Sequence, residues 1–326
     1  MIKTTGVDEV SQVEIKPEGM RIFQYVFLLS SVLILPGVQW PLLSWLNGFV
    51  PLVAFLFLYG FGWSLGNKII LQAVILACAV GFFLQSMPLI LLSLTTLPAG
   101  YVVAYAAERS EEQMITGMKG IVCLGICWLV FWGGLIATNN AFSYSALIHS
   151  VQEGMDASLN VYRQNNSIPV DKLLLIDQLL NQAKVIFPVI LPAILGNIII
   201  VTIWLTMVLG NRLALRYCNK SPWPEYKYWK LPERLIWAAI FSAVLALIPL
   251  RPIQPIGINL LLLVGVFYIF QGVAILVYFF DKWNMPIIFR LPLYMIAVIQ
   301  SSGTFLLLVV GIADIWLDFR RLANKP

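Results

Sequence analysis

The chain is dominated by apolar segments long enough to cross a lipid bilayer, and this feature restricts its fold more than any other. A helix needs about 20 apolar residues to span the hydrocarbon core, and NLLLLVGVFYIFQGVAILVYFF, at residues 259–280, is one such run. Only 11% of the residues are charged, whereas a soluble domain carries about a quarter because its surface faces water. We therefore predict an all-α fold, a polytopic transmembrane helix bundle with about 8–10 membrane helices in contact with the lipid bilayer.

Charges, prolines and glycines divide the sequence into a tail and three further parts. Residues 1–21 form a polar N-terminal tail that lacks the basic-then-apolar order of a signal peptide. A first transmembrane half follows at 22–137, and a polar extracytoplasmic segment occupies 138–184. The second transmembrane half, 185–326, contains a basic loop at 211–234.

The last apolar stretch, 285–317, is too long for one simple crossing and short for two, and SSG at 301–303 divides it. The basic residues Arg320, Arg321 and Lys325 follow it, and such residues mark the cytoplasmic side of a membrane. We expect two short crossings or a re-entrant hairpin, either of which returns the C-terminus to the cytoplasmic side.

The net charge of +5 is distributed over the gaps between apolar segments. It forms no long basic face interleaved with aromatic residues, so we predict no nucleic-acid partner. Lysine and arginine are enriched in alternate gaps, which predicts cytoplasmic gaps and a cytoplasmic N-terminus. The basic residues of these gaps are Lys68, Arg109, Lys119, Arg212, Arg216, Lys220, Lys227, Lys230, Arg234 and Lys282.

The extracytoplasmic segment carries two amphipathic patterns, which predict two helices on the outer membrane boundary or capping the bundle. The first pattern comprises Leu147, Val151, Met155 and Leu159, and the second, which follows Pro169, comprises Leu173, Ile176 and Leu180.

His149, Glu153 and Asp156 share one face of the first of these helices. Imidazole and carboxylate groups on one stripe can hold a metal ion or move a proton. Three ligands from one helix rarely converge on one ion, and the four cysteines form no CxxC pair. We interpret the stripe as a solvated or interfacial face and predict no metal and no cofactor.

Polar residues inside the apolar segments form the main candidate site. Tyr268 and Gln271 share one face of a membrane helix, and Gly272 beside them permits close helix approach. Because lipid offers no hydrogen-bond partner, these groups need partners inside the protein. They either join two helices or line a cavity for a small ligand, and both interpretations stay open.

Asp314 belongs to the same candidate cluster, because it can pair with Arg290 or with a basic residue of the loop at 211–234. An ionisable residue within a membrane segment suggests a functional role by default, but an interfacial anchor would account for it equally well.

The loop sequence SPWPEYKYWKLPER combines basic and aromatic residues. Trp223, Tyr226, Tyr228 and Trp229 would act as anchors beside Arg234, because aromatic residues and arginine concentrate binding energy at interfaces. We predict that this loop is a docking surface for a membrane or cytoplasmic protein partner.

Three segments together resemble a known family. They are YWKLPERLIW at 228–237, the run at 259–280, and GIADIWLDFRRL at 311–322. Their order is similar to that in the DUF2232, or YybS-like, family of bacterial multi-pass membrane proteins. The resemblance implies a location in the bacterial inner (cytoplasmic) membrane and a distant kinship with the substrate-binding subunits of vitamin transporters. It transfers no catalytic residues.

Three functions follow from these features. The first is a non-enzymatic membrane subunit that binds a partner protein. The second is transport or capture of a small, largely apolar molecule near Tyr268, Gln271 and Asp314, with energy from a partner or an ion gradient because the sequence has no ATP-binding motif. A lipid-modifying enzyme ranks third because HExxH and GxSxG are absent, so we predict no enzymatic activity. The oligomeric state stays open.

Overall fold

A computed structural model describes residues 19–38, 41–138, 143–164 and 169–320. Most of the predicted tail at 1–21 lies outside the described residues, as do Arg321 and Lys325. Every regular element in the described part of the chain is helical. The helices are α1 (Gly19–Ile34), α2 (Val50–Phe83), α3 (Met87–Leu94), α4 (Leu97–Glu108), α5 (Gln113–Thr138), α6 (Tyr144–Gln164), α7 (Val170–Cys218), α8 (Leu235–Leu247), α9 (Ile253–Lys282), α10 (Ile287–Ile299) and α11 (Ser301–Leu317), with 3-10 turns at Leu35–Val38, Pro41–Phe49 and Tyr226–Tyr228.

The predicted all-α polytopic bundle is confirmed. Among the described residues, six helical stretches are long and apolar enough to cross a membrane, and α10 and α11 together form one bent candidate for a seventh. The number is smaller than the sequence pattern predicted for three reasons. Two predicted segments share the broken helix α2, α8 has only 13 residues, and α10 and α11 make one unit bent by 92°.

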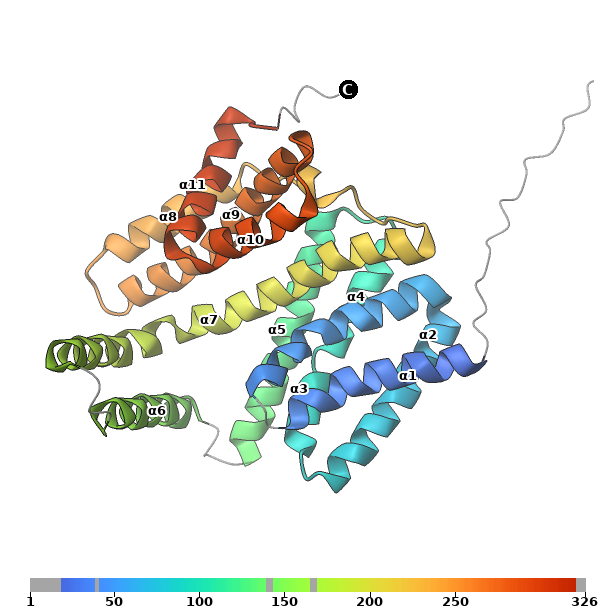
Figure 1. The fold of residues 1–326 in the computed structure, drawn as a ribbon, viewed down its shortest axis with the longest axis horizontal. Coiled ribbons are helices and arrows are strands. Elements are labelled where there is room, and N and C mark those ends of the chain that lie inside the picture. Colours follow the sequence, from blue (N-terminus) through green and yellow to red (C-terminus); the bar gives the residue numbers. More distant parts are fainter. Residues whose placement is uncertain (1–18, 39–40, 139–142, 165–168, 321–326) are drawn as a thin grey trace, which may run out of the picture.

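α2 is broken at Gly62, whose φ of 79° and ψ of 164° lie outside the helical region. The arms at 50–61 and 63–83 diverge from this point, as Figure 1 shows. A Cβ atom on Gly66 would lie 2.8 Å from the carbonyl oxygen of Phe57, so only glycine allows the two arms to approach this closely beside the break.

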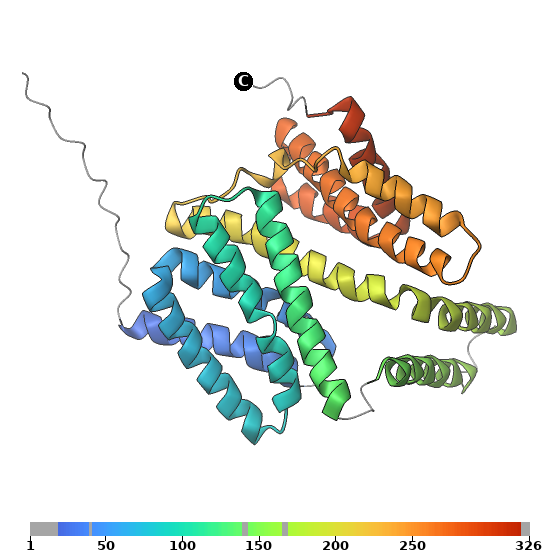
Figure 2. The same cartoon turned by 180° about the vertical axis from the view of Figure 1, so that it is seen from behind.

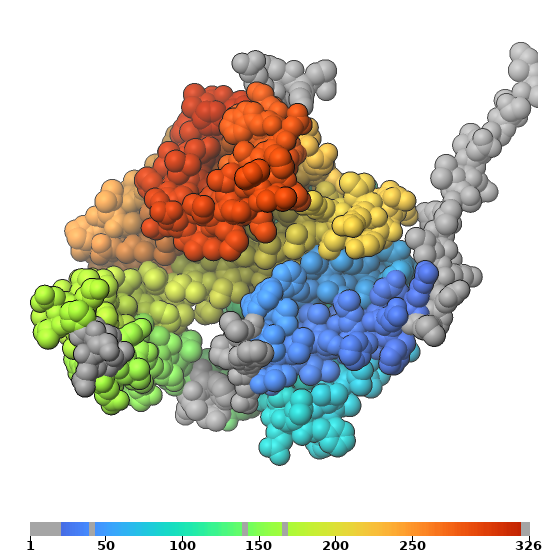
Figure 3. All heavy atoms as spheres, viewed as in Figure 1, coloured from blue at the N-terminus to red at the C-terminus, as the bar shows by residue number. Residues whose placement is uncertain are grey.

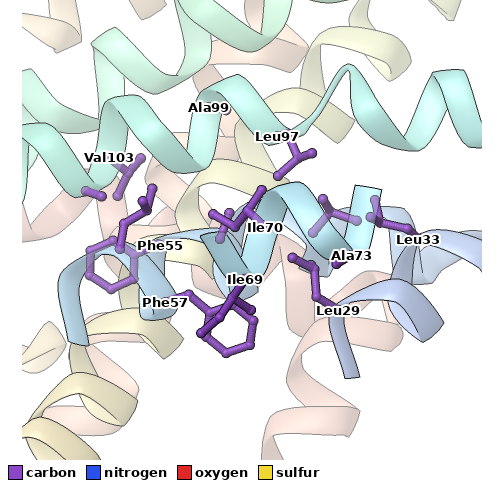
Figure 4. Packing of buried hydrophobic residues seen from close by; sticks show 14 of the residues in the cluster. Leu29, Leu33, Phe55, Phe57, Ile69, Ile70, Ala73, Leu97, Ala99 and Val103 are labelled. Atoms are coloured by element: carbon purple, nitrogen blue, oxygen red, sulfur yellow. The ribbon is translucent and has the colours of Figure 1, made fainter. Parts of the chain in front are cut away.

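An apolar cluster joins α1, α2 and α4 in the N-terminal half (Figure 4). Leu29 and Leu33 of α1, Ile69 and Ala73 of α2, and Val103 of α4 are fully buried there. These helices are therefore held together by close packing of apolar side chains.

α7 lies between the N-terminal helices and the C-terminal group α8 to α11, as Figures 1 and 3 show. It contains 49 residues and is roughly 70 Å long at 1.5 Å per residue. The helix continues through Pro188 and Pro192. The domain boundary predicted between 184 and 185 therefore falls inside one continuous helix.

α6 and the first part of α7 form an antiparallel hairpin apart from the N-terminal helices (Figures 1 and 2). The Tyr144 hydroxyl donates to the Pro188 carbonyl oxygen at 2.6 Å, and Arg163 pairs with Asp177 at 3.1 Å. Leu159 of the predicted apolar stripe is buried. The segment predicted to be amphipathic is thus helical, but its second helix does not end before the membrane segment.

α10 and α11 meet at Gln300 with a bend of 92°. A Cβ on Gly303 would lie 2.8 Å from the Cα of Ala297, so a glycine is needed at this bend. Arg290 near the start of α10 contacts Asp281 at the end of α9, and Asp314 near the end of α11 pairs with Arg320. The choice between two short crossings and a re-entrant hairpin stays a prediction.

Four connecting segments meet at one end of the bundle, which we call the loop face: 109–112, 219–234, 283–286 and 318–320. The Trp223 indole donates to the Glu111 carbonyl oxygen at 3.0 Å, which joins the first two segments. Arg320 donates to the Lys227 carbonyl oxygen at 2.8 Å, which joins the last. The predicted basic gaps after Arg109, Arg212 and Lys282 thus meet at one end of the molecule, whereas Lys68, predicted to lie in a gap, lies within α2.

Candidate functional site

The candidate site begins at the crossing of α9 and α11, where two glycines face the opposing backbones. A Cβ on Gly272 would overlap the Leu307 carbonyl oxygen, and a Cβ on Gly311 would overlap the Tyr268 carbonyl oxygen. Small residues at such crossings let two helix backbones approach closely in a membrane. The role predicted for Gly272 in close helix approach agrees with this geometry.

A buried polar network centres on Asp314 at the end of this crossing. Gln271 Nε2 donates to Asp314 Oδ2 at 2.7 Å, and Arg320 donates to the same oxygen at 2.9 Å. The other carboxylate oxygen, Oδ1, accepts the Phe319 backbone N–H at 3.0 Å. The side chains of Asp314 and Arg320 are both 0% exposed. The carboxylate is therefore neutralised and fully hydrogen-bonded inside the protein.

The same network holds the basic loop. The Leu231 backbone N–H donates to Gln271 Oε1 at 3.1 Å. Arg320 donates to the carbonyl oxygens of Lys227 and Trp229, each at 2.8 Å. A loop of this length, with several of its backbone groups bound by buried side chains, is a fixed part of the structure.

Arg290 does not pair with Asp314, contrary to one of the two partners expected for that carboxylate. It pairs with Asp281 and donates to the Met285 carbonyl oxygen at 2.7 Å. The other expected partner, a basic side chain of the loop at 211–234, does not reach Asp314 either; the loop contributes backbone carbonyls to Arg320 instead. The partner is Arg320 because Asp318 adopts a left-handed conformation with φ of 38°, which turns the chain back toward Asp314.

Lys227 connects the loop to α9. Its ammonium lies 2.7 Å from Glu225 and 3.0 Å from Asp281. Hydrogen bonding to the Glu225 carboxylate, together with the contact to Asp281, raises the pKa of Lys227. Lys227 therefore stays charged, and its ion pairs with Glu225 and Asp281 are kept.

The aromatic residues predicted as docking anchors turn toward the helices. Trp223 is only 3% exposed and stacks on Phe55 at a ring distance of 5.9 Å. The Tyr226 hydroxyl donates to the Phe270 carbonyl oxygen at 2.5 Å, and burial raises the pKa of Tyr226. Trp223 is therefore not an exposed anchor, because its indole fills space between helices.

The other predicted anchors are less enclosed. Trp229 is half-buried and donates its indole N–H to the Pro224 carbonyl oxygen at 2.8 Å. Tyr228 is also half-buried, with the Lys227 ammonium 5.2 Å from its ring centre. Arg234, just before α8, is exposed.

Asn211 of α7 fixes the start of the loop, although the sequence analysis did not single it out. Its side chain accepts the Trp223 backbone N–H at 3.1 Å and donates to the Trp223 carbonyl oxygen at 3.0 Å. It also accepts the Ser221 hydroxyl at 3.0 Å. The available signal was an asparagine at the point where the apolar run ends and the predicted basic loop begins.

A cavity of about 300 Å³ lies beneath the loop, between α5, α7 and α9. Figure 2 shows α5 in front of α7, with the loop passing above them. Its lining is almost entirely apolar and includes Gln271. The lining residues are Gln113, Met114, Gly117, Met118, Ile121, Ile200, Ile203, Trp204, Met207, Tyr226, Trp229, Lys230, Leu231, Leu235, Phe267, Phe270, Gln271 and Ala274.

Tyr268 does not line this cavity. It is 1% exposed, and its hydroxyl has no hydrogen-bond partner within the described residues. Its backbone carbonyl lies against Gly311 instead. Of the predicted polar cluster, the structure thus brings Gln271, Gly272 and Asp314 together.

The stripe on α6 divides between different partners. His149 lies 3.2 Å from Glu153, and both are well exposed, whereas Asp156 pairs with Lys184 of α7 at 2.5 Å. Over the part of the chain that the structure describes, no three His, Cys, Asp or Glu side chains are grouped to hold a metal ion.

Comparison with known proteins agrees with the resemblance seen in the sequence. A family model described as "Predicted membrane protein (DUF2232)" matches residues 28–315. No curated protein and no solved structure matches the chain. Since the family model covers most of the sequence, and since the fold is a bundle of long apolar helices, this protein belongs to the DUF2232 family of multi-pass membrane proteins.

Proposed function

We propose that the protein captures a small, largely apolar molecule in the cavity beneath the loop, with no chemical step. One observation carries this proposal: an apolar cavity of about 300 Å³ lies beside Gln271, roofed by a loop that the buried network holds in place. Ligand sites in proteins are mostly apolar hollows of about 300–1,000 Å³ with a few polar groups. A volume at the low end of that range suits one ring system or chain.

The position of the cavity supports entry from the bilayer. Met114 and Met118 of α5 line the cavity and are 41% and 49% exposed. Methionine side chains adapt to ligands of varied shape. A molecule dissolved in the membrane could therefore move between α5 and α9 without crossing the polar loop.

The test is to purify the protein in mild detergent and identify bound small molecules by mass spectrometry. Gly117 lines the cavity, with Met207 Sδ 3.5 Å from where its Cβ would lie. Gly117→Phe should fill the hollow and lose the bound molecule. Gly125→Phe is the matched control. Gly125 lies on the same helix, α5, and no atom lies within 4 Å of the position its Cβ would take. Equal amounts bound to both variants, or none bound to the unaltered protein, would contradict the proposal.

We place the loop face in the cytoplasm of a bacterium, with the protein in its inner membrane, because the basic residues gather on that face. Lys220 is exposed there. A Lys220→Cys variant, made in a chain lacking the four native cysteines, should react with a membrane-impermeant maleimide only after the cells are opened. Labelling of intact spheroplasts would show that the loop face lies outside the cytoplasm.

Docking of a protein partner on the loop is a second candidate. It is favoured by the fixed conformation of the loop, since a preorganised surface loses less entropy on binding, and by exposed Arg234 and Trp237 at its end. An affinity purification in mild detergent should return a stoichiometric partner from the unaltered protein and not from an Arg234→Ala, Trp237→Ala variant. Recovery of no partner would reject this function.

A further inference from the structure

We infer that an open groove between α4 and α5 holds a membrane phospholipid with an ammonium head group. α4 and α5 pack side by side (Figure 2), and the groove beside them has a volume of about 860 Å³. It is separate from the cavity beneath the loop, although Met118 borders both. The inference therefore does not rest on the proposed function. It depends on three aromatic rings and one carboxylate near the loop face.

The three rings meet at steep angles within the lining. Trp63 directly follows the break in α2, and Tyr101 and Tyr105 lie one turn apart on α4. The Trp63 ring centre lies 5.9 Å from that of Tyr101 at an interplanar angle of 53°. It lies 6.3 Å from the Tyr105 ring centre at an angle of 81°. Aromatic rings that face a cation from more than one direction are a known way to bind ammonium groups.

A carboxylate lies beside these rings. The Trp63 indole N–H donates to Oε2 of Glu108, the last residue of α4. Glu108 is exposed, and within the described residues it pairs with no lysine or arginine. An ammonium group against the rings would therefore gain a negatively charged partner that now binds only an indole.

The other charges at this end of the groove are paired or stacked. Lys119 lines the groove, and its ammonium binds both carboxylate oxygens of Glu111 at 2.6 and 2.7 Å. The Arg109 guanidinium lies 4.2 Å from the Tyr105 ring centre, so it is available to the phosphate that adjoins the ammonium of a zwitterionic phospholipid. Glu112 is exposed nearby in sequence. This end suits a head group with both charges better than one that is only negative.

The rest of the groove suits an acyl chain. Val122 and Ile126 of α5 line it and are 53% and 55% exposed. The lining is almost entirely apolar, which agrees with an ammonium site because a ring face attracts a cation without offering a polar atom. Tryptophan and tyrosine gather where a membrane meets water. The rings near the loop face and the aliphatic residues further along α5 thus follow the order of a lipid, head group and then chain.

The experiment uses the full chain purified in mild detergent. It is mixed with equal amounts of phosphatidylethanolamine, phosphatidylcholine and phosphatidylglycerol that carry identical acyl chains. Native mass spectrometry then counts the lipids that the protein retains. The two ammonium lipids should be retained about tenfold more than phosphatidylglycerol, as expected for a partly desolvated contact between a cation and aromatic rings.

A pair of tyrosine variants tests the rings. Tyr105→Leu should reduce the preference for the ammonium lipids. Tyr217→Leu is the matched control, because Tyr217 is also exposed near the end of its helix and has Arg216 at 5.7 Å from its ring centre, but it does not line the groove. This control should keep the preference.

A pair of glutamate variants tests the charge. Glu108→Gln keeps an acceptor for the Trp63 indole N–H but removes the negative charge, so it should also reduce the preference. Glu112→Gln removes the same charge from the same end of the molecule. Because Glu112 neither lines the groove nor binds a ring, this control should keep the preference.

Each outcome decides for or against the inference. Retention of the expected lipids with loss in both test variants supports it. Equal retention of the three lipids, or a preference that survives both Tyr105→Leu and Glu108→Gln, would overturn it. Higher retention of phosphatidylglycerol would show that Arg109 or Lys119 binds an anionic head group instead. If no lipid is retained, the rings are only an interfacial belt, and the inference is wrong while capture in the cavity beneath the loop is unaffected.

Discussion

The N-terminal helices and the C-terminal helices are held together by different kinds of contact. In the N-terminal half, α1, α2 and α4 meet through apolar side chains, with Leu29 and Phe55 fully buried. In the C-terminal half, α9 and α11 meet through facing glycines and through the hydrogen bond from Gln271 to Asp314, whose buried carboxylate also pairs with Arg320 just after α11. One region depends on the shape of apolar side chains, and the other on backbone proximity and charge.

The difference has a physical cause in the membrane. Lipid chains are as apolar as leucine, so apolar side chains gain stability from packing density and not from leaving water. Polar groups gain more, because lipid offers no alternative partner. We therefore expect single substitutions at the crossing of α9 and α11 to have large effects on stability. We also expect them to displace the loop above the cavity, because the same side chains hold that loop.

The largest effect should follow loss of the buried charge partner. Arg320→Met leaves Asp314 charged and unpaired, and breaking such a pair costs about 3–5 kcal/mol. Unfolding in detergent with increasing SDS, followed by circular dichroism, measures this loss. Arg290→Met is the control, since the Arg290 side chain is 24% exposed and its loss should cost less. A loss below that of the control would remove the contrast between the two regions.

Three residues of this region were predicted from the sequence, and one was missed. Gln271 and Gly272 were predicted either to join two helices or to line a cavity, and Asp314 was placed in the same cluster, because polar groups within apolar runs need partners inside the protein. Arg320 was missed as the partner. In a continuing helix it would not face Asp314, and only the left-handed turn at Asp318 brings it back.

The cavity was harder to anticipate for a related reason. It is formed by α5, α7 and α9 together with the loop, and residues such as Met114 and Phe267 resemble any lipid-facing side chain in the sequence. Hydropathy identifies membrane helices but not which of their apolar faces meet. The loop was predicted to be a docking surface because it combines basic and aromatic residues, whereas Trp223 and Tyr226 turn toward the helices.

The next largest effect belongs to the apolar region. Leu29→Ala removes a fully buried side chain from the cluster of α1 and α2, and such truncations cost about 2–5 kcal/mol in water-soluble cores. The same SDS titration applies. Leu28→Ala is the control, because Leu28 is 48% exposed. If Leu29→Ala costs no more than Leu28→Ala, dense packing does not hold this half together.

A smaller effect should follow a change at the glycine contact. Gly272→Ala places a methyl group against the Leu307 carbonyl oxygen, and overpacking of this kind costs about 1–3 kcal/mol. Since the helices must separate, the substitution should also weaken binding in the cavity beside Gln271.

Gly125→Ala is the control for that change. Its Cβ would meet nothing within 4 Å, and alanine favours a helix by about 1 kcal/mol over glycine, so stability should rise or stay the same. Equal destabilisation by Gly272→Ala and Gly125→Ala would show that α9 and α11 do not approach closely.

The smallest effect tests whether burial, and not charge itself, distinguishes the C-terminal pair. Lys184 and Asp156 form an ion pair of 2.5 Å between α7 and α6, but the Asp156 side chain is 58% exposed. Because water screens an exposed pair, Asp156→Asn should cost about 0.2–1 kcal/mol and leave ligand binding unchanged. If this variant were as destabilising as Arg320→Met, the charge would matter wherever it lies, and the special position of Asp314 beneath the loop would lose its physical basis.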